Sequence, residues 1–168
     1  MHPLLRGLSL VWIASLGAAW AQPPGIEPGW QFGAAQANFS GTWKLNREKS
    51  RYGSLRKPVS VIVTIMHKEP AFQYSGSVVD ADGDLRNFEF SGNIDGRDYP
   101  ATRAFGHGAV SLKWIAPNAM TATFRSNDGK WVEITTWSLS RTGRTLTQRV
   151  RLKGPDGEIS WTEIYDKL

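Results

Sequence analysis

The sequence contains no cysteine, which excludes disulfide bonds and a lipid anchor attached through cysteine. The folded state must therefore be held by packing and hydrogen bonds. No block of five or more like charges occurs, although the formal net charge is +5. Charges scattered in this way are typical of a solvated surface. They do not predict binding to nucleic acid or to an anionic membrane, which needs basic residues gathered on one face.

Residues 1–21 have the pattern of a secretory signal. A short positive start precedes an apolar run from Leu8 to Ala19, which is shorter than the roughly 20 residues of a membrane-spanning helix. Ala19-Trp20-Ala21 is an A-x-A cleavage site that leaves Gln22 as the first residue. We therefore expect a periplasmic or secreted protein with no integral membrane segment; the alternative is an uncleaved N-terminal anchor.

Residues 22–38 are rich in Pro, Gly and Ala and have no periodicity, which predicts a flexible leader. Trp30 and Phe32 are its only large apolar residues, and they either pack on the domain or bind a partner. The rest of the chain, 39–168, has the length of one domain.

Short β-type segments and turn residues alternate through 39–168. Apolar and polar residues alternate from Phe39 onward with the period of two of a half-buried strand. Turn signals recur roughly every 8–12 residues, and no segment after residue 58 has a helical apolar period. The sequence therefore predicts an all-β fold, a lipocalin-like antiparallel up-and-down β-barrel of about ten strands. Tyr99-Pro100 is expected in a short edge strand, because proline donates no hydrogen bond.

Hairpin loops of even length assign the inner face of the last strands. The loops at Asp128-Gly129, Thr142-Gly143 and Gly154–Gly157 together put large apolar residues on one continuous face, which we interpret as the barrel interior. A three-residue loop with a Gly83 bulge between Asp80 and Asp84 would add Arg86, Phe88, Phe90 and Tyr74 to it. At Pro117-Asn118 a two-residue loop would bury Lys113 and a three-residue loop Trp114, of which we favour the second.

The motif Gly41-Thr42-Trp43-Lys44-Leu45 resembles the first strand of the lipocalin and fatty-acid-binding (calycin) families. Ile164-Tyr165-Asp166-Lys167 is similar to the end of the fatty-acid-binding branch, and about ten strands match that branch better than the eight-stranded lipocalins. The resemblance implies a barrel with Trp43 as a structural plug at one end.

A second resemblance is more specific and covers nearly all of 39–168. The segments Trp43–Asn46, Asp95–Pro100 and Val110–Lys113 look like those of a family of exported bacterial proteins. This resemblance implies export and brings no activity with it.

The chain departs from the fatty-acid-binding proteins in two places. Those proteins have two lid helices between their first two strands, where this chain has only about twelve residues. They commonly bind the ligand carboxylate with an arginine two positions before the last-strand tyrosine, and here Glu163 precedes Tyr165 at that spacing. A carboxylate repels a fatty-acid headgroup, so a ligand with a cationic or hydrogen-bond-donating group fits better.

The predicted interior contains a few polar residues among large apolar ones, which is how small-molecule sites are commonly built. Two interpretations stay open: a ligand cavity, or a barrel filled by tryptophan side chains. The predicted ligand-binding residues are Tyr74, Phe90, Trp131, Glu133, Trp137, Gln148, Trp161, Glu163 and Tyr165.

We therefore expect a monomeric, non-enzymatic barrel that binds a small apolar or aromatic molecule without a cofactor. No metal site is predicted: His67 and His107 belong to no ligand-spaced cluster, and Asp80–Asp84 lacks the order of a calcium loop. The alternative function is protein binding, similar to bacterial metalloprotease inhibitors, with residues 22–38 as the working part.

Overall fold

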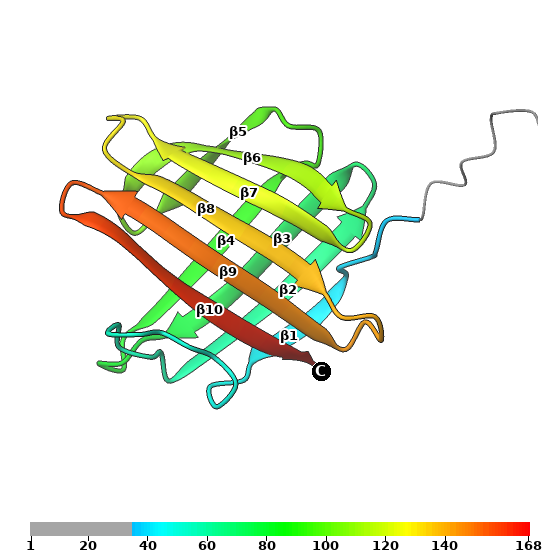
Figure 1. Cartoon of the computed structure of the whole chain (residues 1–168), viewed down its shortest axis with the longest axis horizontal. Coiled ribbons are helices and arrows are strands. Elements are labelled where there is room, and N and C mark those ends of the chain that lie inside the picture. Colours follow the sequence, from blue (N-terminus) through cyan, green and yellow to red (C-terminus); the bar gives the residue numbers. More distant parts are fainter. Residues whose placement is uncertain (1–34) are drawn as a thin grey trace, which may run out of the picture. The chain divides into compact units, whose positions relative to one another are not determined.

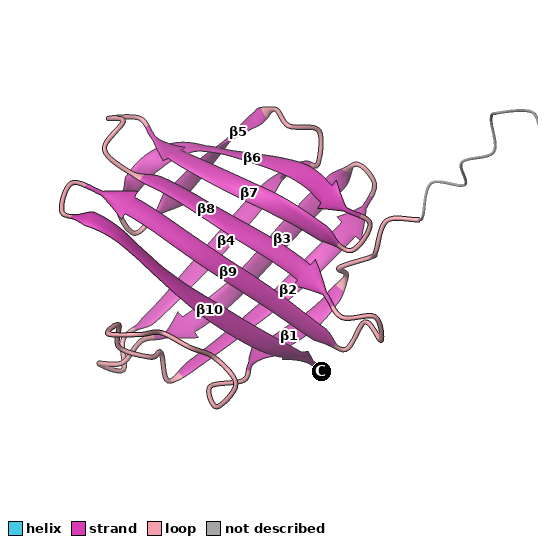
Figure 2. Ribbon diagram, in the orientation of Figure 1, coloured by secondary structure: helices cyan, strands magenta, loops and turns pink. Residues whose placement is uncertain are grey.

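The computed structural model describes residues 35–168, which form ten strands and no helix (Figure 2). The predicted all-β fold is confirmed. The predicted signal, 1–21, and leader residues 22–34 lie outside the described residues. The strands are β1 (Gly41–Leu45), β2 (Ser60–Lys68), β3 (Ala71–Val79), β4 (Leu85–Asn93), β5 (Asp98–Arg103), β6 (Gly106–Ala116), β7 (Ala119–Ser126), β8 (Val132–Leu139), β9 (Thr145–Gly154) and β10 (Gly157–Lys167).

All ten strands belong to one antiparallel sheet that curls into a nearly closed barrel. Their order is β4-β3-β2-β1-β10-β9-β8-β7-β6-β5. β1 pairs with both β2 and the C-terminal strand β10, so the first and last strands are neighbours in the sheet. In Figure 1 the strands β6–β10 lie in front of β2–β4 and cross them steeply. Consecutive strands β4 and β5 are the two edges of the sheet, and we call the interval between them the β4–β5 opening.

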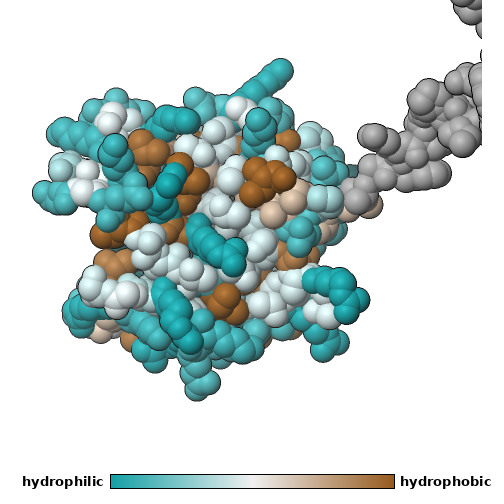
Figure 3. Space-filling model, in the orientation of Figure 1, coloured by the Kyte–Doolittle hydropathy of each residue, from teal (hydrophilic) through white to brown (hydrophobic). Residues whose placement is uncertain are grey.

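The predicted hairpin registers are confirmed. Phe124 lies opposite Glu133, Leu139 opposite Leu146, and Trp161 opposite Val150, as two-residue loops require. The Asp80–Asp84 turn has the expected odd loop: the Asp80 amide donates to the Asp84 carbonyl at 3.0 Å, and Gly83 has a φ of 93°. Apolar side chains thus point inward, while hydrophilic residues predominate on the outer face of β6–β10, with hydrophobic ones in separate patches (Figure 3).

The β6–β7 hairpin differs from the predicted three-residue loop. Ala116 pairs with Ala119 across a two-residue turn, but the register shifts by one residue between Trp114 and Ala116. This bulge places Trp114 opposite Met120 and leaves Lys113 exposed. The predicted faces are therefore right, and the bulge rather than the loop length produces them.

The segment 106–108 is the start of β6, although its two glycines are residues typical of a loop. Gly108 is needed there because a Cβ atom would clash with the Arg125 carbonyl and come within 2.8 Å of the Phe124 ring. A glycine in a strand marks close approach by neighbouring atoms as often as a break.

Trp43 is fully buried. Its indole Nε1 donates to the Phe39 carbonyl at 3.0 Å, and the Lys167 ammonium lies 5.2 Å from its ring centroid. Phe39 in turn contacts Phe72 and Trp114, with ring centroids 6.2 and 5.8 Å away. These rings form a dense aromatic core around Trp43, which supports its role as a structural plug.

We predict that Trp43→Ala lowers the free energy of unfolding by about 3–5 kcal/mol, the cost of a large cavity at a buried aromatic residue. Urea denaturation measures the change. Met66→Ala is the control, because that side chain is 63% exposed and its loss should change stability by less than about 0.5 kcal/mol. Unchanged stability of Trp43→Ala together with loss of ligand binding would contradict the assignment.

Candidate functional site

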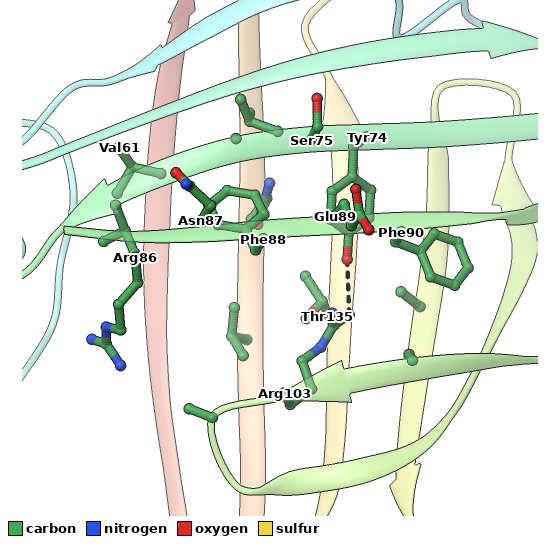
Figure 4. Close-up of a pocket in the computed structure, with 18 of the residues that line it drawn as sticks. Val61, Tyr74, Ser75, Arg86, Asn87, Phe88, Glu89, Phe90, Arg103 and Thr135 are labelled. Carbon is green, nitrogen blue, oxygen red and sulfur yellow. Dashed lines mark hydrogen bonds between the residues drawn. The ribbon is translucent and has the colours of Figure 1, made fainter.

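A hollow of about 2090 Å³ covers part of the barrel interior together with a groove on the outside of the sheet. Inward-facing side chains line it from β2 around the sheet to β10, among them Val63, Phe88 and Tyr165. Outward-facing Thr64, Ser75 and Asn87 line it too, so the hollow continues past the edge of β4 onto the outer face of β2–β4. Figure 4 shows side chains of β3, β4 and β5 around the β4–β5 opening.

Eight of the nine predicted ligand-binding residues line this hollow; Trp131 does not. The ring of Trp131 instead stacks on Phe105, with centroids 5.2 Å apart, and covers Gly154. These eight residues come from strands that are distant in the sequence, and they line the same hollow. Their contact with a ligand stays a prediction.

The first polar cluster surrounds the Glu163 carboxylate. Tyr52 Oη and Trp161 Nε1 donate to Glu163 Oε1 at 2.9 and 3.1 Å, and Tyr165 Oη donates to Oε2 at 2.7 Å. Burial and, second, the nearby Glu163 charge raise the pKa of both Tyr52 and Tyr165. Three donors therefore compensate this carboxylate within the protein itself.

Sequence reasoning missed Tyr52, which lies in the connection between β1 and β2. The connection begins with a single turn, in which Asn46 Oδ1 accepts from the Lys49 amide at 3.0 Å. Arg51 then forms a bridge to Thr162 with two hydrogen bonds of 2.8 Å. This bridge holds the connection against β10 and places the adjacent Tyr52 side chain inside. Tyr52 is the one aromatic residue of that polar connection, and this feature of the sequence could have indicated a buried side chain there.

The second polar cluster lies at the β4–β5 opening. Arg103 Nη2 donates to Tyr74 Oη at 2.9 Å, the dashed line of Figure 4. Arg103 Nε lies 3.8 Å from Glu133 Oε1, which also accepts a long bond of 3.4 Å from Thr135 Oγ1. Burial raises the pKa of Glu133 more than Arg103 lowers it, and burial likewise raises the pKa of Tyr74.

Arg103 was also missed by sequence reasoning, because the predicted fifth strand was too short to include it. In β5 the residues Tyr99, Ala101 and Arg103 alternate with exposed ones, and this period of two continues inward from the predicted Tyr99-Pro100. Extending the strand by three residues beyond Pro100 would have placed Arg103 in the interior.

Trp137 lies beside Tyr74 of the second cluster and is 5% exposed. Its ring contacts Tyr74 and Phe72, with centroids 5.6 Å away in both cases. Among residues 35–168 its indole Nε1 has no hydrogen-bond partner. A buried donor without a partner is rare in native proteins and costs about 1–3 kcal/mol.

In the part of the chain that the structure describes, no three His, Asp or Glu side chains come close enough together to hold a metal ion. His67 is part of the plug: Nδ1 accepts from the Phe39 amide at 3.2 Å, and Nε2 lies 3.0 Å from Glu69 Oε1. No helix of residues 35–168 has the length and apolar character needed to cross a bilayer.

No family model and no curated protein matches this chain. Solved structures do match. A Schistosoma mansoni fatty acid binding protein in complex with arachidonic acid has a TM-score of 0.55 at 12% identity, over 77% of this chain and 96% of that one. The fold is that of the fatty-acid-binding proteins.

Two further structures support the same fold. The zebrafish ileal bile-acid-binding protein complexed with cholic acid has a TM-score of 0.52 at 11% identity, over 77% of this chain and 98% of that one. An apo lipid binding protein of Caenorhabditis elegans has a TM-score of 0.56 at 13% identity, over 77% and 95%. The predicted calycin resemblance is therefore confirmed, whereas the one to exported bacterial proteins stays a prediction.

We predict a loss of stability in alkali from the tyrosines around Glu163. Their pKa is raised above the ordinary 10.0 in the folded state, so the folded protein keeps protons that the unfolded chain releases. The free energy of unfolding should be constant up to about pH 10 and then fall by up to about 1.4 kcal/mol per pH unit for each such tyrosine.

Urea denaturation between pH 8 and 11 measures this slope. Tyr52→Phe removes one of the tyrosines whose pKa is raised. It should therefore make the fall in the free energy of unfolding shallower by up to about 1.4 kcal/mol per pH unit. An equal slope in wild type and Tyr52→Phe would mean that the pKa of Tyr52 is not raised in the folded protein.

Proposed function

We propose that this protein is an exported, non-enzymatic barrel that binds a small, largely apolar molecule in its interior. The observation that carries the proposal is the hollow lined by inward-facing side chains from β2 to β10. Protein interiors are normally packed as densely as organic crystals, so unfilled space beside inward-facing side chains favours an occupant. Trp137 and Trp161 are among the residues that line this space.

The chemistry of the lining supports an apolar or aromatic occupant. Tyr74, Phe90 and Trp137 provide ring surfaces, and Tyr74 and Phe90 stack on each other at 5.5 Å. Burial of apolar area stabilises a complex by roughly 25 cal/mol per Å² before the costs of association. The solved structures with this fold, described as complexes with arachidonic acid and cholic acid, agree with such a ligand class.

Export is part of the proposal and rests on the sequence of residues 1–21. The N-terminal sequence of the protein recovered from the periplasm or the culture medium tests it. A chain that begins at Gln22 supports cleavage after Ala21, and a chain that retains residues 1–21 overturns it.

Binding is tested by titrating tryptophan fluorescence with a library of lipids and aromatic metabolites. Trp137 lines the hollow and Trp131 does not, so the two make a matched pair. We predict that a ligand changes the emission of wild type and of Trp131→Phe, and that the change is smaller in Trp137→Phe, in which Trp161 is the remaining tryptophan of the lining. Unchanged emission with every compound, together with no co-purifying molecule in native mass spectrometry, would contradict ligand binding.

The protein-binding alternative concerns residues 22–38, most of which lie outside the described residues, and it stays a prediction. Ala37 is part of the barrel, because its amide donates to the Pro117 carbonyl at 2.7 Å. Deletion of 22–34 is therefore the clean test. Loss of inhibition of a secreted metalloprotease, with the barrel still folded, would favour this alternative, and an unchanged protein would remove it.

A further inference from the structure

The ion pair between Arg103 and Glu133 is largely buried, but its two charged groups are far apart for a buried pair. Each side chain is only 17% exposed, yet Arg103 Nε and Glu133 Oε1 are 3.8 Å apart, and no hydrogen bond joins the two residues. Removing two charges from water is unfavourable, and the attraction between them offsets this only with close geometry and satisfied hydrogen bonds. The geometry here offsets only part of the desolvation free energy.

Both partners retain hydrogen-bonding capacity beside the hollow. Among residues 35–168 the guanidinium makes one hydrogen bond, to Tyr74, and the carboxylate accepts only the long one from Thr135. A guanidinium has five donor hydrogens and a carboxylate about four acceptor sites. Arg103 and Glu133 both line the hollow, so donors and acceptors are available there side by side.

The other interior carboxylate provides a contrast. Glu163 accepts from Tyr52, Trp161 and Tyr165 at 2.7–3.1 Å, so its charge is compensated without a ligand. The expectation of a ligand with a cationic or hydrogen-bond-donating group treated Glu133 and Glu163 as free acids. One of them is occupied by three donors, and the other has an arginine beside it.

We propose that Arg103 and Glu133 together bind the polar group of the ligand, and that this group is uncharged and both accepts and donates hydrogen bonds, as a hydroxyl or carboxamide does. The proposal rests on the proposed function. The group accepts from the Arg103 guanidinium and donates to the Glu133 carboxylate. Glu133 repels a carboxylate and Arg103 repels an ammonium, so the pair rejects charged analogues of either sign.

Four compounds with one alkyl chain test this selectivity: dodecanol, dodecanamide, dodecanoate and dodecylammonium. Their affinities are measured by isothermal titration calorimetry or by tryptophan fluorescence at neutral pH, below the micelle concentration of each. Wild type should bind the alcohol and the amide about tenfold or more tightly than either ion, since a group left unpaired in a desolvated site loses at least that much.

Two substitutions should shift the preference in opposite directions. Glu133→Gln removes the repulsion of anions and should make dodecanoate the tightest binder. Arg103→Gln removes the repulsion of cations and should favour dodecylammonium. Arg86→Gln is the matched control, because Arg86 lines the same hollow but is 57% exposed and pairs with Asp80 at 3.1 Å; it should keep the wild-type order.

The outcomes separate this proposal from the proposed function. If either ion binds wild type as tightly as the neutral compounds, or if a folded variant keeps the wild-type order, the selectivity proposal is overturned while ligand binding stands. If none of the four binds but the neutral dye N-phenyl-1-naphthylamine does, the selectivity proposal is also overturned. If the dye fails as well, the proposed function itself falls. Should both variants fail to fold, the wild-type order alone decides.

Discussion

The barrel depends on a strand of five residues. β1 pairs with β2 through Gly41–Lys44 and with β10 through Trp43–Leu45, so in the strand order of residues 35–168 it links the β2–β4 part of the sheet to the β5–β10 part. So short a strand contributes few hydrogen bonds of its own. Its position is secured by Trp43, whose burial and whose bond to the Phe39 carbonyl attach the strand to the aromatic core. The rest of the sheet can close only because this link is held on both sides.

Closure of the sheet brings together polar groups that are far apart in the sequence. Glu163 lies 111 residues from Tyr52, and Tyr74 lies 29 residues from Arg103. The two interior carboxylates, alike in type and on the same face, are thereby placed in different electrostatic surroundings. Glu163 is held by neutral donors, whereas Glu133 has a cation beside it, and burial raises the pKa of Glu133. The chemistry of the interior is set by these neighbours more than by the two carboxylates themselves.

The fold could be read from the sequence because two local rules agree along most of the chain. Period-two alternation marks the strands, and two-residue loops such as Asp128-Gly129 fix which residues face each other. The missed features are those for which local rules give no answer. The bulge after Trp114 shifts the register of β6 against β7, which the sequence of one strand does not reveal. Tyr52 is held at the interior by the Arg51–Thr162 bridge, and Arg103 is the last residue of an edge strand in which alternation is brief.

The β4–β5 opening has a consequence for association between molecules. Unpaired strand edges are templates on which another chain can add a strand and begin to aggregate. Here β5 carries Pro100, which has no amide hydrogen to offer, and β4 carries the charged residues Arg86 and Glu89 along its length. These are the devices by which natural sheets protect their edges. The barrel can therefore keep an open side without becoming a surface for fibril growth.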